Sequence, residues 1–130
     1  CGLARATKID IDRAADIGAA SYIKLKLMKA GGLDALADGV AQIRDLGMTP
    51  VLGNGVASDP GCWMEACAAR RLIDNAGEMN GFLKPETGIF ASPLAVRNGS
   101  VVLEPGAPAL KPAAELSALA SATAEFTRRT

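Results

Sequence analysis

The chain has 130 residues, and its 14 basic side chains balance its 14 acidic ones, so the formal net charge is zero. A neutral chain without a basic cluster argues against nucleic acid or an anionic membrane as the main partner, and the absence of histidine removes the commonest general base and metal ligand. Because Cys1, Cys62 and Cys67 lack CxxC spacing, we expect neither a zinc site nor a disulfide framework, and we predict a reduced, cytoplasmic setting.

The first part of the chain is predicted to alternate between helices and strands. In chain order the predicted elements are a helix at 10–17, a strand at 21–27, a helix at 33–46, a strand at 49–53 and a helix at 59–74. Asp10 and Asp59 stand where helix N-caps are expected, and Gly47 stands where a helix should end. Strands that alternate with helices predict a parallel sheet built from βαβ units.

The second part of the chain is rich in proline and has shorter elements. A third strand is predicted at 78–83, and a hairpin at 94–97 and 100–104 is joined by a tight turn at Asn98-Gly99. A last helix is predicted at 115–128, with Phe126 among its apolar residues.

Two lysines in the first strand are the most informative residues. Lys24 and Lys26 occupy alternate positions, so they share one face of the strand. An ammonium group inside a parallel sheet is costly unless it is paired. One explanation is an edge strand with a wet face; the other is a barrel strand whose lysine lies at the C-terminal mouth, where barrel active sites occur. A partly desolvated lysine at such a mouth can act as a base.

Further candidates stand where the second strand gives way to a helix. Asn54 and Asp59 occupy this position, and Asp59 has the pattern of a helix cap more than that of a catalytic group. In the helix at 59–74, Trp63, Cys67 and Arg70 are expected to share one stripe. The sequence gives Cys62 and Cys67 no basic partner, so neither is predicted to be a nucleophile.

The run Lys24-Leu25-Lys26-Leu27-Met28-Lys29-Ala30-Gly31-Gly32-Leu33 resembles the K-[LM]-x-K-x-G-G element of the mandelate racemase/muconate-lactonizing subgroup of the enolase superfamily. The order of the later elements is also similar, over about residues 10–119. The resemblance implies an α/β fold: the C-terminal portion of a (β/α)7β TIM-like barrel, about strands 6 to 8 with their helices. Residues 1–84 would form this partial barrel, and 85–130 the barrel closure and a tail returning to a capping domain.

The resemblance also implies a chemistry. Members of this family remove the proton alpha to a substrate carboxylate, and Mg²⁺ bound by three carboxylates stabilises the enediolate. Lys26 would be the acid/base lysine of a racemase, cycloisomerase or dehydratase, and we assign Lys24, Asn54 and Asp59 to substrate binding. Ala57 stands where the family often has a glutamate, which makes Asn54 a candidate hydrogen-bond donor in its place.

The resemblance transfers no metal ligand to this chain. The last metal-binding aspartate of the family would fall near residues 1–4, which carry no carboxylate. We therefore expect this chain to be a C-terminal fragment that is inactive alone. The intact enzyme would need Mg²⁺, a small carboxylate substrate, and the missing N-terminal part of the barrel or a partner chain. We also expect the intact enzyme to form a homo-oligomer. The alternative is a non-catalytic half-barrel that acts as an assembly module through its exposed sheet edge.

Overall fold

The computed structural model describes residues 8–18 and 20–120, and its helices and strands follow one another in a βαβαβ pattern flanked by further elements. In chain order they are α1 (Lys8–Asp16), β1 (Tyr22–Leu25), α2 (Leu27–Ala30), α3 (Leu33–Asp45), β2 (Thr49–Asn54), α4 (Asp59–Leu72), β3 (Glu78–Met79), the 3-10 helix η1 (Gly81–Leu83), β4 (Val96–Arg97), β5 (Ser100–Val101) and α5 (Ala113–Leu119). Among the described residues, no helix combines the length and the apolar character that crossing a bilayer requires.

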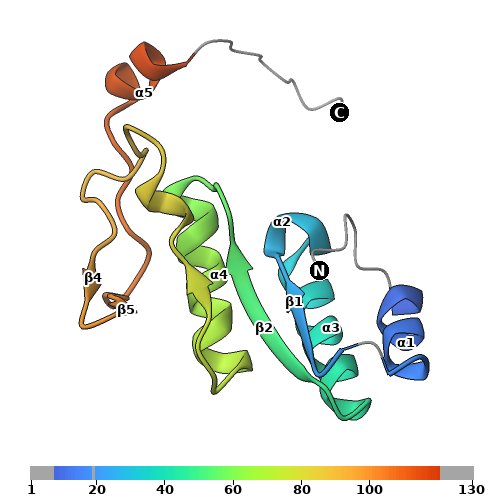
Figure 1. Cartoon of the computed structure of the whole chain (residues 1–130). Coiled ribbons are helices and arrows are strands. Elements are labelled where there is room, and N and C mark those ends of the chain that lie inside the picture. The colour runs from blue at the N-terminus through green and yellow to red at the C-terminus, as the bar shows by residue number, and fades with distance from the viewer. Residues whose placement is uncertain (1–7, 19, 121–130) are drawn as a thin grey trace, which may run out of the picture.

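A three-stranded parallel sheet in the order β1-β2-β3 organises the first half of the chain. The register pairs Lys24 with Val51 and Gly53 with Glu78. Helix α3 connects β1 to β2 and α4 connects β2 to β3, and Figure 1 shows both helices lying along the sheet with α1 beyond α3. The predicted parallel α/β arrangement is therefore confirmed.

The core lies between the sheet and helices α1 and α3. Alternate residues of β1 point into it, because Ile23 and Leu25 are buried while Tyr22 is exposed. The buried members of the cluster are Ile11, Ile23, Leu25, Leu36, Val40, Ile43, Met48 and Leu52. Since the apolar side chains of β1 all face the helices, its lysines must lie on the opposite face of the sheet.

The predicted elements differ in extent from the observed ones, most clearly at the first strand, the third strand and the last helix. Strand β1 ends at Leu25, because Leu27 already begins the short helix α2. Strand β3 has only two residues, and the chain then turns into η1 instead of continuing to Leu83 as a strand. The last helix is observed as α5, and the predicted residues 121–128 lie outside the described part of the chain.

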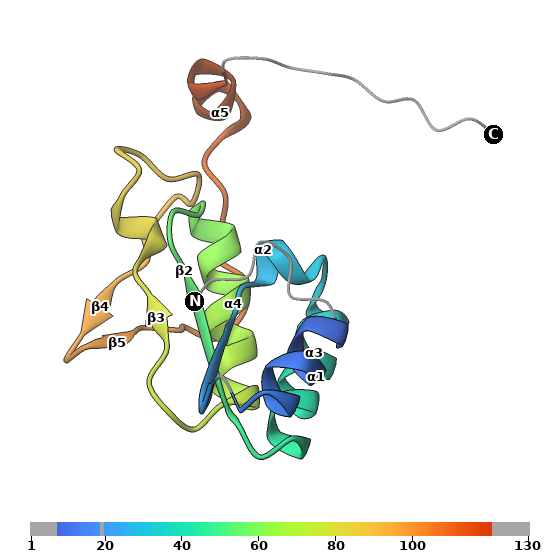
Figure 2. The same cartoon turned by 45° about the vertical axis from the view of Figure 1, so that its right-hand side comes forward.

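The predicted hairpin is confirmed, with strands shorter than expected. Strands β4 and β5 pair antiparallel, with Val96 opposite Val101. Asn98 and Gly99 join them with φ values of 51° and 77°, the two positive angles that a type I′ turn requires. Figure 2 shows this hairpin beside β3, away from β1.

The predicted stripe of Trp63, Cys67 and Arg70 is not the buried side of α4. Its buried residues are Asp59, Cys62, Glu65 and Ala66, whereas Arg70 is exposed. The prediction assumed that the buried side of α4 is its more apolar side. Two of the four buried side chains are acidic, so this assumption selects a different side of the helix. Their carboxylates are hydrogen-bonded, and buried polar groups are stable only under that condition.

Candidate functional site

The candidate site lies at the C-terminal ends of the three parallel strands, on the face of the sheet that the helices do not cover. Lys24 and Lys26 alternate with the buried Ile23 and Leu25, so both lysines project from this face, and both are half-buried. Ends of parallel strands are where α/β proteins place their ligands. In the described sheet β1 is an edge strand, so both interpretations of these lysines, a barrel mouth and an edge strand with a wet face, stay open.

Lys24 forms an ion pair across the sheet. Its ammonium group contacts Oε2 of Glu78 on β3, and its side chain reaches there by crossing Gly53 of β2. Removal from water is the main cause that lowers the pKa of Lys24, and the nearby charge of Lys26 lowers it further. The carboxylate of Glu65 has the opposite effect. Lys24 and Glu78 therefore join the two outer strands of the sheet on its open face.

Gly53 makes this crossing possible. A Cβ atom at this position would lie 2.9 Å from the backbone oxygen of Glu78, 2.9 Å from its Cβ, and 2.9 Å from Cε of Lys24. The backbone oxygen cannot move away without disturbing the pairing of β2 with β3.

We expect Gly53→Ala to lower the free energy of unfolding by roughly 1–3 kcal/mol, the usual range for overpacking. The matched control is Gly55→Ala, because a Cβ there would meet only Nζ of Lys26, at 3.5 Å, an ordinary contact. Both variants are made in the protein expressed from its natural reading frame, and urea unfolding measures the free energy of unfolding of each. Equal midpoints for the two variants would contradict the steric role of Gly53.

Lys26 occupies the junction between β1 and α2. Its backbone is extended, with φ −134° and ψ 132°, and its carbonyl accepts hydrogen bonds from the amides of Lys29 and Ala30. Its Nζ lies 3.5 Å from the point where a Cβ on Gly55 would stand, so the amine extends over the end of the neighbouring strand. The side chain that the sequence singled out as catalytic is therefore at the mouth-like end of the sheet.

Asn54 ends β2 and is almost fully buried, with 1% exposure. Its Nδ2 donates to Oε2 of Glu65 at 3.1 Å, and its Oδ1 accepts from the amide of Gly81 at 2.8 Å and from Sγ of Cys62 at 3.4 Å. Its predicted role in substrate binding is untested, and the amide is already engaged inside the protein.

Glu65 is a site residue that the sequence analysis missed. It is 2% exposed, and its Oε1 accepts from the amide of Leu27 at 3.3 Å. The available signal was helical spacing: Glu65 follows the buried Cys62 by three positions and precedes the partly buried Ala69 by four, so it shares a face with small side chains.

Asp59 is not the helix cap that the sequence predicted. Ser58 is the N-cap of α4, and its Oγ accepts from the amide of Gly61. Asp59 is 5% exposed and accepts from the amides of Ile89 at 3.0 Å and Phe90 at 2.7 Å. Its predicted contact with substrate is untested; both oxygens already hold the segment that follows η1.

Cys62 is buried, and its thiol is not activated. Burial is the main cause that raises the pKa of this thiol, and the carboxylates of Glu65 and Asp59 raise it further. A hydrogen bond with the backbone of Phe82 opposes the rise but does not cancel it. The surroundings of Cys62 therefore disfavour its thiolate, and its lack of a nucleophilic role stays a prediction.

The described residues do not fit the Mg²⁺ ion that the resemblance implies. Within residues 8–18 and 20–120 there is no group of three or more cysteine, aspartate or glutamate side chains that could hold a metal. The carboxylates nearest to the strand ends already have partners: Asp59 and Glu65 bind amides, and Glu78 binds Lys24. Mg²⁺ prefers several free oxygen ligands, which this part of the chain does not offer.

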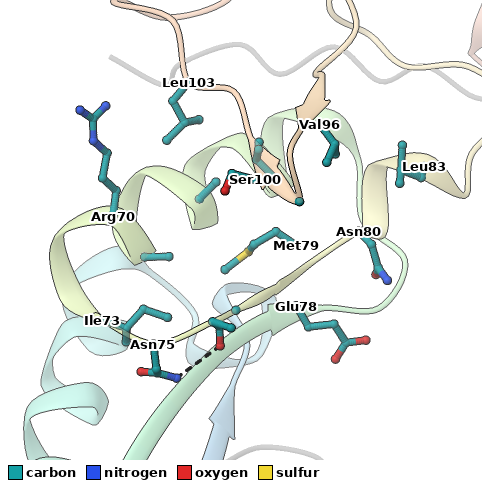
Figure 3. Close-up of a pocket in the computed structure, with 16 residues that line it drawn as sticks. Arg70, Ile73, Asn75, Glu78, Met79, Asn80, Leu83, Val96, Ser100 and Leu103 are labelled. Carbon is teal, nitrogen blue, oxygen red and sulfur yellow. Dashed lines mark hydrogen bonds between the residues drawn. The ribbon is translucent and has the colours of Figure 1, made fainter.

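A separate groove lies between α4, β3 and the hairpin, and has a volume of about 760 Å³. Figure 3 shows Met79 within it, while the carboxylate of Glu78 points away. Asn75 lines the groove, and its Oδ1 is buried and has no hydrogen-bond partner. The charged side chains in the lining of the groove are those of Arg70 and Glu78. Lys24 and Lys26 are not among the residues that line this groove, and Glu78, which pairs with Lys24, is the carboxylate in its lining.

Comparisons with known proteins connect this geometry to one group of enzymes. No family model matches the chain, and no curated protein matches it. A muconate cycloisomerase from Pseudomonas fluorescens is 27% identical, with a TM-score of 0.74 over 86% of this chain and 32% of that one. A mandelate racemase/muconate lactonizing protein from Herpetosiphon aurantiacus is also 27% identical, with a TM-score of 0.63 over 75% of this chain and 28% of that one.

A muconate lactonizing enzyme from Mucobacterium Smegmatis has the same fold at 24% identity, with a TM-score of 0.73 over 86% of this chain and 33% of that one. The resemblance to the mandelate racemase/muconate-lactonizing subgroup is confirmed by these structures. The chain spans about a third or less of their length, and it shares the parallel α/β architecture of part of such enzymes.

Proposed function

We propose that this chain forms the C-terminal part of the barrel of an enolase-superfamily enzyme, in which Lys26 moves the proton alpha to a substrate carboxylate. In this proposal β1, β2 and β3 are the sixth, seventh and eighth barrel strands. The observation that carries it is the place of Lys26, at the C-terminal end of a parallel strand with its amine over the end of the next strand. The similarity to enzymes named for muconate and mandelate chemistry supports the same conclusion.

The open face of the sheet suits a substrate that is an anion. Lys24 and Lys26 both project there, and the charge of Lys84 also acts on Lys24. The opposing charges are Glu78, which Lys24 pairs with, and Glu65, whose carboxylate acts on Lys24 more strongly than Lys84 does. A carboxylate bound beside Lys26 would thus meet a net positive field, which favours binding and holds the acidic carbon close to the amine.

Mg²⁺ would supply electrostatic stabilisation of the enediolate in such an enzyme. Because the described residues do not fit this ion, its ligands have to come from other residues, and we derive no step of the reaction from it. We further propose that the remaining barrel strands, from the same protein or a partner chain, complete the site along the open edges of β1 and β3. Homo-oligomer formation and a cytoplasmic location stay predictions.

The direct test is exchange of the alpha proton with solvent. The protein expressed from its natural reading frame is incubated in deuterium oxide with Mg²⁺ and a panel of small carboxylates, and mass spectrometry follows deuterium at the alpha carbon. We expect incorporation into at least one carboxylate. Absence of incorporation across the panel would oppose the enzymatic proposal.

The open edges of β1 and β3 also favour the second candidate, a non-catalytic half-barrel that pairs with another chain. Measurement of the mass of the natural protein and its complexes separates the two. A chain of this length that assembles through its edges and gives no exchange supports the assembly module.

A further inference from the structure

We infer that Glu65 is a positioning residue, which holds the backbone of Lys26 through a hydrogen-bond network and so sets where its amine stands. The network is buried at Asn54 and partly buried at Leu27. The inference rests on the proposed function for the role of Lys26, but the network itself is a feature of the structure. Glu65 lies on α4, 38 residues after Leu27, and is 2% exposed.

The first link is between Glu65 and the start of α2. Lys26 is the N-cap residue of this helix and gives it no side-chain cap, because an ammonium group has no acceptor to offer the helix amides. Oε1 of Glu65 accepts from the amide of Leu27 instead, at 3.3 Å. This amide belongs to the peptide bond that directly follows Lys26. A carboxylate from another helix thus anchors the chain beside the candidate base.

The second link joins the other two strand ends. Oε2 of Glu65 accepts from Nδ2 of Asn54 at the end of β2, and Oδ1 of Asn54 accepts from the amide of Gly81, just after β3. The ends of β1, β2 and β3 are therefore connected through two buried side chains. The amine of Lys26 extends over this same region, near Gly55.

Each group in the network has a fixed role as a donor or an acceptor. Glu65 must accept at both oxygens, and Asn54 must donate to Glu65 while accepting from Gly81. A glutamine at position 65 has one oxygen only. If that oxygen accepts from Leu27, the NH2 group of the glutamine faces the NH2 group of Asn54. A half turn of the Asn54 amide removes this conflict, but it places Nδ2 of Asn54 against the backbone N–H of Gly81. If the oxygen instead accepts from Asn54, the NH2 group of the glutamine faces the backbone N–H of Leu27. Every arrangement leaves two buried donors facing each other.

The test uses Glu65→Gln, which keeps size and shape, in the protein expressed from its natural reading frame. We expect kcat for alpha-proton exchange to fall by about 10–100-fold with KM nearly unchanged, because a misplacement of about 1 Å at a reacting group costs up to about 100-fold. We also follow acetylation of Lys26 by acetic anhydride, with Lys111 as the internal reference. The ratio of the Lys26 rate to the Lys111 rate should rise about tenfold in Glu65→Gln, because loss of one hydrogen bond allows a change of this size.

The double variant Glu65→Gln/Asn54→Asp is the rescue. The glutamine then donates to the carboxylate at position 54 and accepts from Leu27, while that carboxylate accepts from Gly81. The three bonds that join Leu27, position 65, position 54 and Gly81 are thus restored with the original net charge. The weak hydrogen bond from Nδ2 of Asn54 to Sδ of Met79, at 3.7 Å, is the one contact that the double variant does not replace. We expect kcat and the acetylation rate of Lys26 to return toward the original values. Asn54→Asp alone should be as damaging as Glu65→Gln, because two carboxylates then face each other.

The two readouts separate this inference from the proposed function. If the original protein gives no exchange, the proposed function fails, and acetylation of Lys26 still tests the positioning. Unchanged acetylation of Lys26 in Glu65→Gln would overturn the inference. So would a loss of activity or stability that the double variant does not recover, because the effect would then not come from this network.

Discussion

Replacement of Lys26 by methionine is expected to reduce alpha-proton exchange by about 100–10,000-fold, the range that a positioned general base contributes. Methionine keeps an unbranched side chain of similar width, so it preserves the packing of the stem over the end of β2 while removing the amine. The backbone of Lys26 is held by the helix α2 and by the amide next to it, and the substitution touches neither. The expected loss is therefore one of chemistry, with the fold retained.

Lys29 supplies the matched control. It lies three residues later in the same motif, but on α2 instead of the strand end, and is half-buried like Lys26. Lys29→Met should keep most of the exchange rate, measured as deuterium incorporation into the same carboxylate. Equal losses in the two variants would mean that general electrostatics, and not the amine of Lys26, supports the reaction. Retention of exchange in Lys26→Met would remove it from the base position altogether.

The sequence predicted the parallel sheet because its strands and helices follow local regularities. The alternation around Ile23 and Leu25 separates a core face from a lysine face. Helical spacing predicts Leu33, Leu36, Val40 and Ile43 as the buried side of α3, and all but the exposed Leu33 are buried. The strand pattern continued to Leu27, however, because an apolar residue at the start of a helix is indistinguishable from one at the end of a strand.

The network around Glu65 could not be predicted in the same way. A buried carboxylate is stable only if donors surround it, and those donors come from Leu27 and Asn54, which lie far away along the chain. The early end of β3 has a similar origin, since the amide of Gly81 turns toward Asn54. A buried acidic residue such as Glu65 is polar, so a pattern of apolar residues along the chain assigns it to the exposed face of its helix. The contacts that make its burial favourable come from residues that are distant in the sequence.

Asp59 gives the largest expected effect on stability. Its two oxygens accept from the amides of Ile89 and Phe90, and hydrogen bonds to a charged group contribute about 1.5–3 kcal/mol each. Asp59→Ala should therefore lower the free energy of unfolding by about 3 kcal/mol or more. Asp38→Ala, an exposed position on α3, is the control and should change it by less than about 1 kcal/mol.

The local consequence of the Asp59 substitution distinguishes a tether from a general loss of packing. Phe90 is 4% exposed and also contacts Trp63 of α4 edge to face, with 6.5 Å between the ring centroids. Hydrogen exchange at Ile89 and Phe90 should accelerate first in Asp59→Ala, while amides of β1 keep their protection. Gly88→Ala should reproduce this pattern, because a Cβ there would overlap Oδ2 of Asp59. Uniform acceleration across the sheet in both variants would show that Asp59 supports the whole fold, and that residues 88–90 are not held by it in particular.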